Sequence, residues 1–356
     1  PLLSFLILVW LGFSGLHLCQ RACWWSPGAR LWLARWCRAA AWPRAAHRQP
    51  PEVHRRHPNI LILYVRRLGL GMEDVRVSYG PQHARQPHPD LDVLIDQRWE
   101  EACAANPRLF AGPKFRLRRI AWADGGSSVE LDLGPTTYKE YLGTNRLAAE
   151  ERLRLERDGE RDCGDRAAHL SNALGCEALL ITADDQVVLL RRSGAVATHS
   201  GLWNGPSGHP EPERAVPERA GAERAGGAGA AEPSEEAERL VLRELFDSVL
   251  QEVEEETNVP RGCLGPPLLI GCMADGTGKP DVLFLVRTSL DAAAVRSQFE
   301  KGAAEGWESD RIAFRPAASL AAELCGGPLR LTAVTRAAWA CLLELRRAAA
   351  GEGAGA

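Results

Sequence analysis

The sequence has no excess of basic residues: 43 Lys and Arg stand against 46 Asp and Glu, and the formal net charge is −3. Long nucleic acid is therefore not an expected partner, because proteins that bind it usually carry a basic surface. The ten cysteines also lack a C-x-x-C motif and any spacing typical of zinc ligands. We interpret them as reduced thiols, which predicts a cytoplasmic or nuclear protein.

The first 57 residues differ in composition from the rest of the chain. Residues 1–18 are strongly apolar, and the segment that follows is rich in Trp, Arg and Pro. A signal peptide or a short membrane anchor is one interpretation of such a start. The chain begins with Pro, however, and no clean cleavage site follows. We therefore expect residues 1–57 to be an extraneous or disordered leader, and we do not expect a membrane anchor.

With 356 residues, 45% hydrophobic and 25% charged, the chain can form one large or two small domains. Residues 58–167 are expected to form a small α/β module. Its predicted elements are a strand at 59–65, a helix ending near Asn106-Pro107, a hairpin of 114–121 with 129–133 around Asp124-Gly125-Gly126-Ser127, and a loop and helix over 136–155.

Residues 168–348 are expected to form the main domain. Its predicted elements are a hairpin of 178–182 with 187–190, a long central helix, strands at 268–273 and 282–287, a helix at 289–299, a short strand at 312–314 and a final helix at 329–347. Mixed strands with helices on both sides predict an α/β/α sandwich. A disordered tail is expected at 349–356.

The end of the central helix carries an acidic run beside an apolar stripe. The stripe has the spacing of a helix packed against a core, and its members are Leu242, Leu245, Phe246, Val249, Leu250 and Val253. Glu252 and Glu256 are one turn apart at the border of the stripe, Glu255 lies farther round the same side, and Glu254 points the opposite way. Clustered carboxylates repel one another and favour a bound cation. An acidic run alone is usually only a solvated helix end.

A glycine-rich segment upstream favours the cation. It reads Gly205-Pro206-Ser207-Gly208-His209-Pro210-Glu211-Pro212, and with the acidic run it resembles the Nudix box, G-x5-E-x7-R-E-U-x-E-E-x-G-U, where U is aliphatic. Glycine at 208 lets the backbone approach metal and phosphate closely. The positions that match are Gly208, Glu252, Val253, Glu255, Glu256 and Val259.

The match departs from the pattern in four ways. Gln251 replaces the box arginine and Asn258 the second glycine. The middle glutamate of the box falls at Arg243, with Glu244 one position late. The separation of Gly208 from Glu252 is 44 positions where the pattern has 15, so an insertion of 29 residues splits the motif. We expect its low-complexity part, residues 213–233, to be a flexible surface loop.

From about Pro58 to Ala340 the chain is similar to the branch of the Nudix hydrolase family that acts on UDP-sugars. The resemblance implies the Nudix α/β/α sandwich with a mixed sheet, preceded by the small α/β module that contributes to the nucleotide site. It implies Mg²⁺-dependent cleavage of UDP-glucose or UDP-galactose to UMP and sugar 1-phosphate, with Mn²⁺ as a substitute metal. Glu252 and Glu256 would hold the metal, and Glu255 and Glu244 are candidates to complete its coordination or orient water.

The same resemblance implies a set of substrate-binding residues. Phe110 and Tyr138 would line the uridine site, where a base stacks on a ring. Arg192 would bind phosphate oxygens. The remaining positions, in or near the glycine-rich segment, are Ala197, Asn204, His209 and Glu211. The UDP-sugar branch of the family carries Asp at the position of Asn204. The neutral Asn204 therefore offers no negative charge to the sugar.

Two other functions are compatible with the sequence. A Nudix enzyme could act on another diphosphate, such as ADP-ribose, a dinucleotide or coenzyme A. The substitutions at Gln251 and Asn258 would also suit a catalytically inactive nucleotide-sugar-binding module. Retention of Glu252, Glu255 and Glu256 favours an enzyme, because an inactive site has no need of mutually repelling carboxylates.

Overall fold

The computed structural model of the chain describes residues 60–63, 69–107, 109–124, 127–194, 199–216, 234–324 and 327–352. The leader predicted at 1–57 lies outside these residues. Among the helices of the described segments, none has the length and apolar character needed to cross a membrane.

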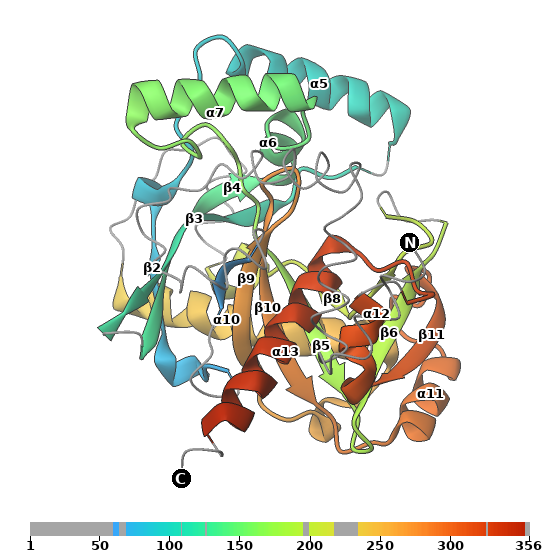
Figure 1. Cartoon of the computed structure of the whole chain (residues 1–356). Helices are drawn as coiled ribbons and strands as arrows, with labels where there is room; N and C mark the ends of the chain where they lie inside the picture. Colours follow the sequence, from blue (N-terminus) through green and yellow to red (C-terminus); the bar gives the residue numbers. More distant parts are fainter. Residues whose placement is uncertain are drawn as a thin grey trace, which may run out of the picture.

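A mixed eight-stranded sheet forms the centre of the molecule (Figure 1). Its main path runs β1 (Ile60–Leu63), β9 (Leu268–Ala274), β10 (Pro280–Arg287), β5 (Gly175–Ile181), β6 (Gln186–Arg192) and β11 (Ser309–Pro316). The short strands β7 (Trp203–Asn204) and β8 (Ser207–Gly208) pair with β6 and β5. Strands β10 and β5 are parallel, while the other pairings are antiparallel. The mixed sheet predicted from sequence is therefore confirmed.

Helices cover both faces of this sheet. The central helix α10 (Glu235–Thr257) and α11 (Ala292–Glu300) pack on one face. Helices α12 (Leu320–Leu324) and α13 (Ala333–Glu352) pack on the other. Alternate residues of β5 enter the two cores, as the twofold period of a strand requires: Cys176 faces α10 and Leu179 faces α13. The α/β/α sandwich is confirmed.

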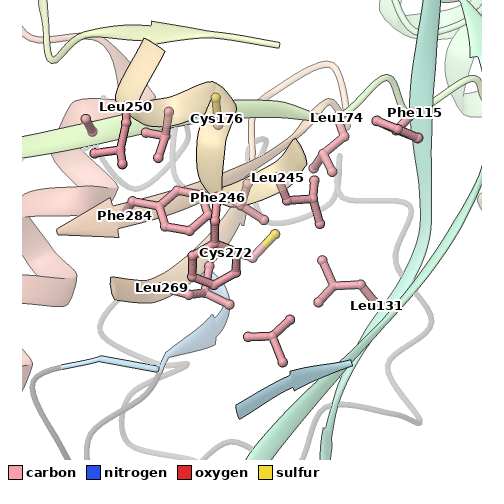
Figure 2. Packing of buried hydrophobic residues seen from close by; sticks show 14 of the residues in the cluster. Phe115, Leu131, Leu174, Cys176, Leu245, Phe246, Leu250, Leu269, Cys272 and Phe284 are labelled. Carbon is pink, nitrogen blue, oxygen red and sulfur yellow. The ribbon is translucent and has the colours of Figure 1, made fainter. Parts of the chain in front are cut away.

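Helix α10 forms as its sequence predicts. Ser234 caps its start by accepting a hydrogen bond from the Ala237 backbone N–H, 3.1 Å away. The apolar stripe is buried except for the half-buried Leu242, and Phe246 meets Phe284 of β10 edge to face at 5.1 Å between ring centroids (Figure 2). Such a stripe fixes the rotation of the helix about its axis, and so determines which glutamates face the glycine-rich segment.

A second, three-stranded sheet packs against α10. Its order is β2 (Val75–Tyr79), β4 (Ser128–Thr137) and β3 (Pro113–Ala123), and the antiparallel pairing of β3 with β4 confirms the predicted hairpin. Phe115 and Leu131 of this sheet belong to the same core as Leu245 of α10 (Figure 2). Helices α5 (Asp92–Ala105), α6 (Tyr138–Gly143) and α7 (Ala149–Cys163) complete this part of the chain.

The structure differs from the predicted boundaries at three places. Strand β1, expected in the N-terminal module, instead adds to β9 at the edge of the large sheet, because the periodicity of a strand does not specify its partner. The start of the insertion is not a surface loop. Pro212–Ala215 forms the short helix α8, and Ala215 and Val216 are only 5% and 8% exposed. Helix α13 continues to Glu352, so the first residues of the expected tail are helical.

Candidate functional site

The glycine-rich segment lies directly against the acidic end of α10. Gly208 of β8 pairs with Cys176 of β5, which fixes the position of this segment on the large sheet. A Cβ atom at position 208 would overlap the carboxylate of Glu252. The Glu252 carboxylate also accepts a hydrogen bond from the backbone N–H of His209. Glycine is therefore required at 208 for steric reasons, as the motif predicts.

Three carboxylates of α10 bind alternate backbone amides of this segment. Glu256 accepts from the Ser207 N–H at 2.9 Å, and Glu244 accepts from the Glu211 N–H at 2.9 Å. Glu252 occupies the position between them. Alternate amides of an extended segment point the same way, and glutamates spaced by one and two helical turns face them. The two halves of the split motif therefore meet in space despite the insertion between them.

The departures from the box have local structural explanations. Glu244 is buried on the site side of the helix and Arg243 is exposed, so the shifted glutamate is the one that faces the segment. Gln251 donates a hydrogen bond to a carboxylate oxygen of Glu255 at 2.6 Å, which orients that side chain. Asn258 ends the helix with φ 58°, a left-handed conformation that Asn tolerates better than most residues other than Gly.

A group of carboxylates suited to a metal ion lies at the end of α10. Oxygens of Glu252, Glu255 and Glu305 all lie within 4.8 Å of one another. Glu305 follows α11, and its backbone N–H donates to the carbonyl of Glu255 at 2.9 Å. Within the described residues Glu256, predicted as a ligand, is not a member of this group. It is buried, and one of its oxygens is bonded to Ser207.

Glu305 is not predicted from the sequence. It lies in the connection between a predicted helix and a predicted strand, 49 positions after Glu256. Its only local signal is a second acid, Glu308, three positions on. Nothing in the periodicity of either neighbouring element indicates that this connection returns to the end of α10.

Burial and mutual repulsion dominate the electrostatics of the cluster. Burial raises the pKa of Glu252 to about 8, and the negative charges of Glu305, Glu255 and Glu308 add to the effect. Burial also raises the pKa of Glu256 well above its usual value. Deprotonated carboxylates in this arrangement need a cation to offset their repulsion, and oxygen ligands suit a hard divalent ion. The residues present therefore fit a divalent metal.

The raised pKa values predict how the stability of the metal-free protein depends on pH. The folded state holds the proton of Glu252 up to about pH 8, whereas an unfolded glutamate loses its proton near its usual pKa of 4.5. Stability should therefore fall, by on the order of a few kcal/mol, as the pH rises from about 5 to about 8. Urea unfolding in EDTA across this range measures the fall. It should be smaller for Glu252→Gln, and identical profiles for the two proteins would contradict the assignment.

The two aromatic residues predicted to bind uridine lie at one end of the β3–β4 hairpin. Pro113 and Thr137 are paired there, with Phe110 just before the first strand and Tyr138 just after the second. The backbone N–H of Tyr138 donates to the carbonyl of Gly112 at 3.0 Å, which ties the two segments together. Phe110 is 64% exposed, an unusual degree for a phenylalanine and one that suits a ligand-facing ring.

Arg192 ends β6 close to the acidic cluster. Burial raises the pKa of both Glu256 and Glu308, and the positive charge of Arg192 opposes that rise in each case. The charge of Arg192 therefore reaches these carboxylates, and its phosphate-binding role stays a prediction. Ala197 lies outside the described residues.

The other predicted binding residues lie within the glycine-rich segment or directly before it. Asn204 is buried and donates to the Ser207 hydroxyl at 2.9 Å, while its side-chain carbonyl oxygen has no hydrogen-bond partner among the described residues. Glu211 forms an ion pair with Arg214 at 3.0 Å. Burial and nearby positive charges lower the pKa of His209 well below its usual value, so this side chain is neutral near pH 7.

Comparison with known proteins gives consistent relatives. The chain is 39% identical over 250 residues to the uridine diphosphate glucose pyrophosphatase NUDT22 of Mus musculus, a match that covers 69% of this chain and 77% of that protein. The Homo sapiens protein of the same name is 39% identical over 69% of this chain and 79% of its own length. Nudix hydrolase 9 of Arabidopsis thaliana is 30% identical, with 68% and 78% covered.

No family model matches the chain. Among solved structures, the MutT protein of Methanosarcina mazei is 16% identical over 50% of this chain and 94% of its own, with a TM-score of 0.27.

Proposed function

The chain belongs to the Nudix hydrolase family, and on that premise we propose that it hydrolyses the diphosphate of UDP-glucose or UDP-galactose to UMP and sugar 1-phosphate. The observation that carries the proposal is the close contact between the Glu252 carboxylate and Gly208. Glu255 and Glu305 lie beside Glu252 in the same group. This arrangement joins the metal-binding acids to a backbone segment that a phosphate can approach.

Members of this family depend on a divalent metal, and we propose Mg²⁺, with Mn²⁺ as a substitute. Glu252, Glu255 and Glu305 would hold it, and Glu256 stays a proposed ligand through the oxygen that Ser207 does not occupy. When bound, the ion would neutralise diphosphate oxygens and lower the pKa of a water molecule. We propose Glu308, whose negative charge helps to raise the pKa of Glu252 and whose own pKa is raised by burial, as a candidate general base.

The remaining side chains would bind and orient the substrate. Phe110 and Tyr138 offer rings on which uracil can stack. Arg192 offers a guanidinium to phosphate oxygens. We place Asn204, Ala197, His209 and Glu211 next to the sugar and phosphate. The side-chain carbonyl oxygen of Asn204, which has no partner within the described segments, could accept a hydrogen bond from a sugar hydroxyl.

The test is a substrate profile of the full chain with Mg²⁺. UDP-glucose and UDP-galactose should yield UMP and sugar 1-phosphate, whereas ADP-ribose, dinucleotides and coenzyme A should turn over at least ~100-fold more slowly, because their bases or leaving groups do not match the uridine site. Preferential hydrolysis of ADP-ribose would instead assign a different diphosphate to this site. UDP-glucose binding without turnover would indicate an inactive binding module.

A further inference from the structure

Two lysines, Lys114 and Lys279, lie close enough together for the charge of Lys279 to help lower the pKa of Lys114. The chain has only four lysines, at 114, 139, 279 and 301. A Cβ atom on Gly175 of β5 would overlap the Lys279 ammonium, so this side chain crosses directly over the glycine. Lys114 approaches from β3, because the carbonyl of its neighbour Phe115 accepts a hydrogen bond from the Leu174 N–H at 2.8 Å.

The pairing of strands places these lysines between two parts of the proposed site. Cys176, next to Gly175, is paired with Gly208, which contacts Glu252. In the other direction, Lys114 is two positions after Gly112, whose carbonyl accepts the backbone N–H of Tyr138. A ligand that reaches from the aromatic pair to the acidic cluster would therefore pass the lysines.

The two lysines differ in their partners. Lys279 is half-buried and forms an ion pair with the buried Asp281, with 2.5 Å between Nζ and Oδ1. Lys114 is half-buried, yet across the described part of the chain no carboxylate lies within 4.0 Å of its ammonium group. Burial lowers the pKa of Lys114, and the more distant charges of Glu211 and Glu252 oppose that change without forming a pair.

Partial burial of an ammonium group without a counterion costs free energy, and a bound anion offsets that cost. Phosphate is the anion whose chemistry suits this position, because a lysine ammonium binds phosphate oxygens as a compact charge with three donors. Of the two carboxylates whose charges reach Lys114, Glu252 belongs to the metal-binding group and Glu211 is paired with Arg214.

We propose that Lys114, supported by Lys279, binds the diphosphate of the substrate between the uridine rings and the metal-binding glutamates; this inference rests on the proposed function. Lys114 is then a substrate-binding residue beyond those that the motif indicates. Its charge stabilises the phosphate that stays with the nucleoside after cleavage. The phosphate of the product UMP should therefore bind Lys114 as well.

The test compares Lys114→Ala with a control variant, Lys301→Ala, which removes the same side chain from an exposed position. Lys114 is a cleaner target than Lys279, whose removal would leave Asp281 buried without its partner. UMP and uridine binding are measured by calorimetry without metal, and the KM for UDP-glucose with Mg²⁺. For Lys114→Ala we expect UMP binding at least ~10-fold weaker and KM raised at least ~10-fold, with uridine binding unchanged. Lys114→Arg should restore part of the loss, and Lys301→Ala should match the native protein.

Unchanged UMP affinity in a folded Lys114→Ala protein would overturn the inference while leaving the proposed function intact. Failure of the native protein to bind UMP or to hydrolyse UDP-glucose would instead contradict the proposed function, and this inference with it. If the alanine variant does not fold, reductive ¹³C-methylation of the native protein gives a second measurement. Added UMP should then shift the Lys114 signal and leave that of Lys301 in place, and an unmoved Lys114 signal would count against the inference.

Discussion

Replacing Glu252 by Gln should lower turnover of UDP-glucose by on the order of 10³-fold while leaving the fold intact. The substitution keeps the shape of the side chain and an oxygen that can accept the His209 N–H. It removes one of the three negative charges that Glu252, Glu255 and Glu305 offer to a divalent ion. Turnover and thermal unfolding of the same preparation measure the two parts of this expectation.

Glu254→Gln is the matched control. Glu254 lies on the same helix two positions away but is exposed on the opposite side, so its loss should change turnover by less than about twofold. Equal turnover by Glu252→Gln and Glu254→Gln would contradict the role assigned to Glu252.

Gly208→Ala should lower turnover by on the order of 10²-fold or more, the second largest effect we expect. The added methyl would overlap the Glu252 carboxylate, so either the glutamate or the glycine-rich segment must move. A displacement of about 1 Å in a catalytic group is enough for a loss of this size. The measurement is kcat/KM for UDP-glucose at saturating Mg²⁺, because excess metal reveals whether the loss is only one of metal affinity.

Gly262→Ala provides the control for this prediction. Gly262 follows α10 in the chain, and a Cβ atom there would have no described atom within 4 Å. Its replacement by alanine should leave turnover unchanged. Native activity in Gly208→Ala would show that the close approach to Glu252 has no catalytic importance.

The elements predicted from sequence are those that local signals define. The apolar stripe and the Ser234 cap define α10, and the turn residues at 124–127 define the β3–β4 hairpin. In each case the residues that determine the structure are neighbours along the chain. The side of α10 that carries Glu252 follows from the same periodicity, so the sequence alone predicts that this glutamate faces the glycine-rich segment.

Contacts between distant segments could not be predicted in this way. The pairing of β1 with β9, the return of Glu305 to the end of α10 and the hydrogen bond between Phe115 and Leu174 all depend on tertiary packing. The alternation of residues in a strand gives its faces but not its partner. Position 208 was identified only because the motif is known, since the insertion removes the normal spacing to Glu252.

The most direct test of the account is the location of a divalent ion. Crystals of the native protein and of Glu252→Gln, both soaked with Mn²⁺ and UMP, should be compared in anomalous difference maps. The account predicts a strong peak beside the oxygens of Glu252, Glu255 and Glu305 in the native protein, and a weak peak or none in the variant. Ordered UMP without a peak at these oxygens in the native crystal would contradict it.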